Sequence, residues 1–133
     1  MRENPQAAGA LERSKARLDR LALYPLPVRI EHVRVFVWPA LFRLPWFRRF
    51  DGYSAWNTIL LREPPELAGD DLVCHELCHV WQMQHHPLAM PLSYLRTGYE
   101  RNPYELEARR AAAVGPPEGG PTDASATAPP SER

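Results

Sequence analysis

The spacing of hydrophobic residues along the chain predicts an α+β protein. Residues 10–23 carry leucines at helical spacing, whereas residues 28–38 alternate valines with other side chains, which is typical of a strand. Residues 56–62 are rich in β-branched and other apolar residues and predict a second strand. Residues 39–52 are rich in proline and arginine, so we expect a connection between the two strands there.

Two longer helices are expected in the second half of the chain. The first spans residues 70–86, with Asp70 or Asp71 as its N-cap and a proline directly after its end. The second spans residues 103–114 and stops at a Gly-Pro pair. Each helix is long enough to contribute an apolar face to a core.

A short helix is expected between these two, within residues 87–99. Apolar side chains recur there at intervals of about one helical turn. We therefore expect Leu92, Tyr94 and Leu95 to turn inward.

Length and composition fit one small domain. The chain has 133 residues, of which 44% are hydrophobic, enough for one core and hardly for two. From residue 115 onward the sequence is Pro, Gly, Ala, Ser, Thr and charge without apolar periodicity, which predicts disorder. We expect a single domain over residues 1–114, with an N-terminal helix and a core over residues 28–114, followed by a disordered tail over residues 115–133.

Charge and hydropathy narrow the classes of partner. The formal net charge is zero, which removes the electrostatic footprint of a nucleic-acid-binding protein. The longest apolar stretch, residues 35–47, is interrupted by two prolines and Arg43 and is too short for a transmembrane segment. No secretory signal is visible, so a cytoplasmic protein is expected. An interfacial membrane contact through the aromatic and arginine-flanked part of this stretch is left open.

The helix expected over residues 70–86 carries a His-Glu-x-x-His motif. His75 and His79 are four residues apart, about 6 Å along a helix axis and about 40° around it, so both imidazoles can bind one zinc ion. Glu76 then falls beside the metal, where it can take a proton from a zinc-bound water as a general base. The residues around the motif are uncharged, as expected of a helix packed inside a domain.

This motif resembles that of the zincin metallopeptidases. A catalytic zinc needs a third protein ligand. Glu105, followed three residues later by an alanine, is similar to the third ligand of the gluzincins, the thermolysin-like branch of the zincins. The resemblance implies that His75, His79 and Glu105 hold Zn²⁺ and that Glu76 activates water for peptide-bond hydrolysis. Glu107, in the same turn, is a second candidate for the third ligand.

Several observations keep alternatives open for the third ligand. Glu105 also occupies the capping-box position behind Asn102, and capping alone would explain it. His85 stands where metzincins have their third histidine, but Gln82 replaces the glycine that breaks their helix, so a continuing helix turns His85 away. Arg109 stands where several gluzincins have an aspartate that orients the first histidine, and a guanidinium cannot accept that hydrogen bond.

The two cysteines and three tyrosines near the motif have simpler roles. Cys74 and Cys78 do not have the spacing of a haem-attachment motif, and we expect them to be small apolar side chains of the buried helix face. The oxyanion donor is unresolved. Tyr94, Tyr99 and Tyr104 are candidates, although each is also suited to simple packing.

The resemblance implies a small β-sheet packed on the motif helix, with a second helix bringing Glu105. In zincins an edge strand ahead of the motif helix pairs with extended substrate, and residues 56–62 hold that position here. The chain has no sizeable second lobe, so a cleft for a peptide or protein substrate would be shallow or completed by a protein partner. The alternative function is a non-catalytic zinc-binding interaction module derived from the same fold.

Overall fold

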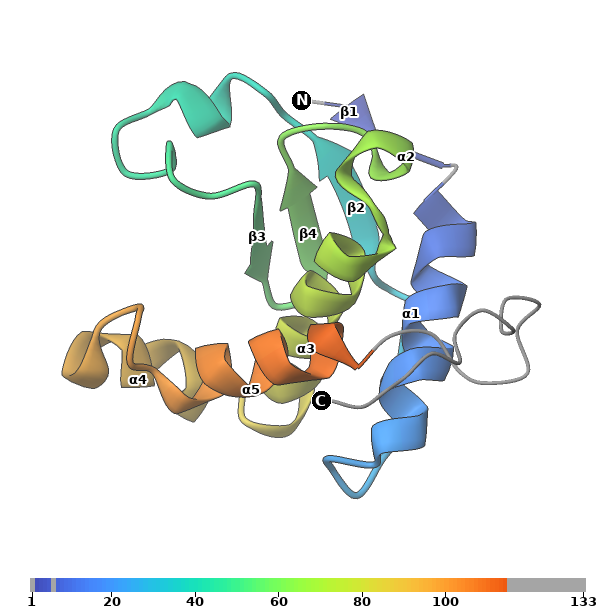
Figure 1. Ribbon diagram of the computed structural model, residues 1–133, viewed down its shortest axis with the longest axis vertical. Coiled ribbons are helices and arrows are strands. Elements are labelled where there is room, and N and C mark those ends of the chain that lie inside the picture. Colours follow the sequence, from blue (N-terminus) through green and yellow to red (C-terminus); the bar gives the residue numbers. More distant parts are fainter. Residues whose placement is uncertain (1, 6, 115–133) are drawn as a thin grey trace, which may run out of the picture.

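The computed structural model describes residues 2–5 and 7–114 and confirms the α+β class (Figure 1). The expected disordered tail lies outside the described residues. In chain order the elements are β1 (Arg2–Glu3), α1 (Ala7–Leu21), β2 (Arg34–Val37), the 3₁₀ helix η1 (Leu41–Arg43), β3 (Gly52–Ala55), β4 (Thr58–Leu61), α2 (Pro65–Ala68), α3 (Asp70–His85), α4 (Ala89–Thr97) and α5 (Pro103–Ala113).

The four strands form one mixed sheet in the order β1-β2-β4-β3. β2 and β4 are parallel, with Val35 opposite Ile59, and the two outer pairs are antiparallel. β4 is interior, and its Ile59 and Leu61 are completely buried. Both expected strands are present, although each is shorter than its hydrophobic pattern predicts.

The edge of the sheet beside α3 is β3, so the expectation that residues 56–62 form the substrate-facing edge is wrong. Ala55 pairs with Thr58, and the hairpin between them turns on Trp56 and Asn57. Trp56 has φ +52°, a left-handed conformation that bulky residues rarely adopt. The turn contains no glycine, so the sequence pattern merges it with the following strand.

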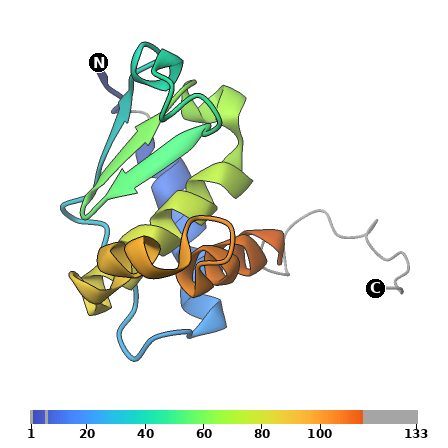
Figure 2. The ribbon, with the colours of Figure 1, turned by 90° about the vertical axis from the view of Figure 1, so that its left-hand side faces the viewer.

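α3 lies at the centre of the molecule. It contacts β3 and β4 as well as α1 and α5. Figure 2 shows it between the sheet and the pair α4 and α5. Burial is therefore almost continuous along the helix, and Cys74, Leu77, Cys78 and Trp81 are completely buried. Both cysteines are free, as expected of small apolar side chains in this helix.

α3 begins differently from the prediction. Asp70 is its first helical residue, Gly69 precedes it with φ +96°, and no side chain caps the helix. Instead, Asp70 pairs with Arg13 at 2.6 Å, and Asp71 pairs with Arg17 at 3.0 Å. The two aspartates therefore connect α3 to α1.

α4 confirms the expected short helix, but the expectation that Leu92 and Leu95 turn inward is wrong. These side chains are 58% and 85% exposed, whereas Met90 is buried and Tyr94 half-buried. Met90 and Tyr94 are four residues apart and share the face that packs on the molecule. Within the described ranges, no helix is long and apolar enough to cross a membrane.

Candidate metal centre

α3 and α5 bring His75, His79 and Glu105 together. Their ligand atoms lie within 4.8 Å of one another. One Glu105 oxygen is 3.1 Å from His75 Nε2, and the other is 2.9 Å from His79 Nε2. Glu105 is 1% exposed, so its carboxylate is enclosed by these partners. The three residues that the motif and the resemblance single out therefore form one cluster.

The cluster keeps Glu105 in the state that a metal ligand needs. Burial raises the pKa of this carboxyl, but hydrogen bonds with His75 and His79 have the larger combined effect. The pKa of Glu105 is therefore well below its ordinary value. Glu105 is therefore ionised at neutral pH. A divalent cation at this position would meet one carboxylate and two imidazoles, of which that of His75 is partly exposed.

Gln82 holds the imidazole of His79 in place. The amide nitrogen of Gln82 donates to the Tyr104 carbonyl at 2.8 Å and to Glu107 at 2.9 Å, which turns the amide oxygen toward His79. That oxygen lies 2.8 Å from His79 Nδ1. An N–H group at Nδ1 can donate to this oxygen, which leaves Nε2 without a proton and directed at the cluster. Most metal-binding histidines donate their other ring N–H in this way. The motif does not reveal this role, although Gln82 is three residues after His79 on the same helix.

Glu107 and His85 lie outside the cluster. Glu107 accepts hydrogen bonds from Gln82 and from the Tyr24 hydroxyl. The ring of His85 stacks on Tyr24 with centroids 5.0 Å apart, because α3 continues without a break through this position. Within the described residues, only His75, His79 and Glu105 meet as a possible metal site.

Glu76 is held against the sheet edge by β3. Ser54 Oγ donates to the Glu76 carboxylate at 2.5 Å and lies 3.0 Å from the Glu76 carbonyl oxygen. At Gly52, a β-carbon would stand only 3.0 Å from the other carboxylate oxygen, Oε2. Neither contact can be foreseen from the motif, because both depend on the register of a strand that the sequence pattern does not reveal.

Capping does not explain Glu105. Asn102 caps α5, because its side-chain oxygen accepts from the backbone N–H groups of Tyr104 and Glu105 at 2.8 and 3.2 Å. The Glu105 carboxylate turns away from this cap toward the histidines. The Glu105 backbone N–H is bound by the helix cap, whereas its carboxylate contacts His75 and His79.

A tyrosine and an arginine complete the surroundings of Glu105. Tyr99 donates its hydroxyl to Oε2 at 3.0 Å, and Arg109 Nε donates to the same oxygen at 3.1 Å. Burial raises the pKa of Tyr99 to about 12, so its hydroxyl stays a donor at neutral pH. Tyr94 lies farther away, at 3.5 Å from Oε1. Arg109 therefore supports the Glu105 carboxylate instead of orienting a histidine.

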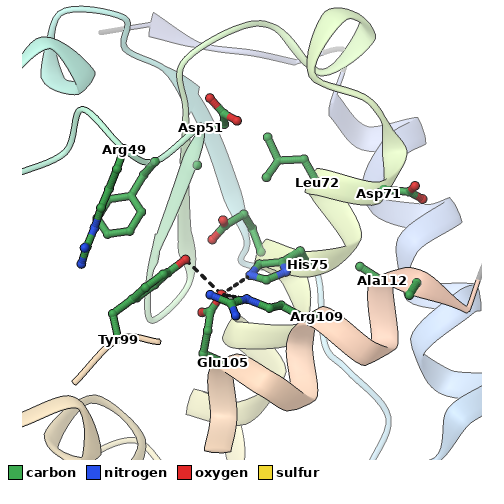
Figure 3. Close-up of a pocket in the computed structure, with 13 residues that line it drawn as sticks. Arg49, Asp51, Asp71, Leu72, His75, Tyr99, Glu105, Arg109 and Ala112 are labelled. Carbon is green, nitrogen blue, oxygen red and sulfur yellow. Dashed lines mark hydrogen bonds and ion pairs between the residues drawn. The ribbon is translucent and has the colours of Figure 1, made fainter. Parts of the chain in front are cut away.

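Two cavities open on the cluster, of about 300 and 450 Å³. Figure 3 shows the larger one, with His75 and Glu105 on one side and Arg49 and Tyr99 on the other. The smaller one continues past His79 toward α4. The residues that line both cavities are Arg49, Phe50, Gly52, His75, Glu76, Tyr99 and Glu105.

No protein-family description, curated protein or solved structure matches this chain. The functional conclusion therefore comes from the donor set and its setting. Two imidazole nitrogens and one carboxylate oxygen are a ligand set of catalytic zinc sites, which keep a fourth position open. The residues present fit such an ion.

Proposed function

We propose that this chain is a zinc-dependent metallopeptidase-like protein of the zincin type. His75, His79 and Glu105 hold the ion, and Glu76 is the general base. The observation that carries the proposal is the convergence of these three ligand atoms within 4.8 Å beside a cavity that Glu76 also lines. Three protein ligands next to open space are the arrangement of a catalytic site rather than of a closed structural one.

When bound, zinc supplies a Lewis acid that polarises the scissile carbonyl and lowers the pKa of the attacking water. Ser54 fixes one oxygen of Glu76, which leaves Oε2 to take the proton from that water and pass it to the leaving amine. Tyr99 and Arg109 hold Glu105 in its position as a ligand. Gln82 does the same for His79.

Peptides are the substrates that suit this site. β3 is an edge strand, and its residues Gly52, Tyr53 and Ser54 line the smaller cavity. An extended peptide can add to such an edge through main-chain hydrogen bonds. In this proposal β3 takes the role that the sequence resemblance gave to residues 56–62.

The proposal is tested with Glu76→Gln. The amide keeps the shape of the side chain and leaves the three ligands intact, so zinc content and folding should match those of the wild type. Turnover of an unfolded protein or a peptide library should fall about 10²-fold to 10⁴-fold, because the proton acceptor is lost. Glu66→Gln, at an exposed position of α2, is the matched control and should leave turnover unchanged.

Two outcomes would contradict catalysis at this centre. Equal cleavage by wild type and Glu76→Gln would assign the activity to another base or to a contaminating protease. Absence of cleavage by the zinc-loaded wild type across the library would favour the non-catalytic zinc-binding module instead.

A further inference from the structure

Arg49 is placed to meet a substrate at the candidate metal centre. It lines both cavities that open on the cluster. Its guanidinium carbon lies 5.0 Å from the ring centroids of both Phe50 and Tyr99, so two aromatic rings support it. Figure 3 shows Arg49 across the pocket from His75. An arginine stacked in this way loses little freedom when it binds a ligand.

The charge of Arg49 is not balanced by a neighbouring carboxylate. Within residues 2–5 and 7–114, the structure gives Arg49 no ion pair. Four other charged side chains of the larger cavity are in ion pairs, in the couples Asp51–Arg62, Asp71–Arg17 and Arg109–Glu105. The remaining carboxylate of that cavity, Glu76, accepts a hydrogen bond from Ser54. The Arg49 guanidinium therefore packs on two aromatic rings at the cavity wall, and its N–H groups can donate to a ligand.

The ring of Tyr99 connects Arg49 to the metal centre. The ring contacts the Arg49 guanidinium, and its hydroxyl donates to Glu105 Oε2 at 3.0 Å. An extended chain advances about 3.3 Å per residue, so the space across one tyrosine side chain corresponds to roughly two residues of substrate. A group bound by Arg49 would therefore lie close to the scissile bond.

We propose that Arg49 determines specificity by binding a substrate carboxylate, so that the site prefers peptides with a carboxylate within about two residues of the scissile bond. The planar guanidinium suits a carboxylate because it can donate two parallel hydrogen bonds. Either an acidic side chain or the C-terminus of a short peptide supplies this group. The inference rests on the proposed function, because it assigns a substrate class to the same site.

The test measures binding of hydroxamates to the zinc-loaded full chain by calorimetry. The probes are a succinyl hydroxamate coupled to leucine, with either a free carboxylate or a carboxamide, and the same hydroxamate coupled to glutamic acid α-amide. In the wild type at least one of the two carboxylate probes should bind about tenfold more tightly than the carboxamide, as expected of one hydrogen-bonded charge pair. A gain for the leucine acid alone indicates a C-terminus, and a gain for the glutamate probe alone indicates an acidic side chain.

Variants separate recognition from packing. In Arg49→Met the ratio of carboxylate-probe affinity to carboxamide-probe affinity should fall to about one, while the carboxamide probe keeps its affinity. Arg49→Lys should retain part of the preference for carboxylate. Arg48→Met is the matched control, because this neighbouring exposed arginine lines neither cavity. The preference should persist in that variant.

Two results would overturn the inference, and they differ in what they say of the centre. If all three probes bind the wild type equally well, Arg49 does not select carboxylates, although hydroxamate binding still supports the metal centre. If no hydroxamate binds the zinc-loaded chain, the proposed function fails together with the inference.

Discussion

Glu76 illustrates how single contacts prepare this site. Its motif position places it beside the histidines, but β3 decides where its carboxylate lies. Ser54 holds one oxygen, and the missing side chain of Gly52 makes room for the other. Similar support reaches His79 from Gln82 and Glu105 from Tyr99. The geometry of Glu76, His79 and Glu105 is therefore set by partners that the motif does not contain.

Gly52→Ala should impair turnover without loss of zinc. A β-carbon at this position would stand 3.0 Å from Glu76 Oε2, so the carboxylate must shift. Displacement of a catalytic group by about 1 Å can cost about 10²-fold in rate. The measurement is kcat/KM together with zinc content, and Gly9→Ala on the exposed side of α1 is the control. Unchanged kcat/KM in Gly52→Ala would show that Glu76 is not the group that must be placed.

The loss of zinc affinity should be largest for a substituted ligand and smaller for residues that contact the ligands. Glu105→Ala should weaken zinc binding by orders of magnitude, because one of three ligands is lost. Gln82→Leu should cost about 10-fold to 100-fold, as is typical when the partner of a metal-binding histidine is removed. Glu107→Ala should cost less, because it acts only through Gln82. Zinc titration against a competing chelator measures all three.

A different ranking would point to a different site. His85→Ala should leave zinc affinity unchanged, because that imidazole stacks on Tyr24 away from the cluster. A large loss with this variant, and none with Glu105→Ala, would move the third ligand to His85.

At the scale of elements, α3 organises the molecule because it is buried on nearly every side. The residues at their ends predict this helix and α5 well, since Pro87 follows α3 and Asn102 and Pro103 begin α5. β3 was missed because the hairpin turn contains Trp56 in a left-handed conformation instead of glycine. The buried face of α4 was predicted wrongly, because the hydrophobic pattern of so short a helix does not identify the buried side.

The cysteines of α3 should be unreactive in the folded protein. Burial raises the pKa of both Cys74 and Cys78 above that of a free thiol, so little reactive thiolate is present at pH 8. Iodoacetamide should label neither thiol in native buffer and both in about 6 M guanidinium chloride, as followed by mass spectrometry. Rapid labelling of the native chain would mean that α3 is not packed as the structure shows.

At the scale of the whole molecule, the centre joins parts that are distant in sequence. α3 carries His75, Glu76 and His79, α5 carries Glu105, and Ser54 of β3 holds the Glu76 carboxylate. The sequence predicted that these four residues lie together, because His75, Glu76 and His79 belong to one local motif and Glu105 lies in a segment that resembles a known ligand helix. Ser54, Gly52 and Arg49 could not be predicted, because their roles depend on strand register and on the packing of side chains across the cavity. Gln82 was missed although it is three residues after His79 on the same helix.

The proposed function depends on zinc binding by this cluster. Zinc binding can be measured by elemental analysis of the purified full chain after dialysis against metal-free buffer. The wild type should retain about one zinc ion per chain, whereas His75→Ala and His79→Ala should retain almost none, because two remaining ligands cannot hold the ion against competition. A wild-type chain without zinc after growth in zinc-containing medium, or histidine variants that keep a full equivalent, would show that His75, His79 and Glu105 do not form a zinc site.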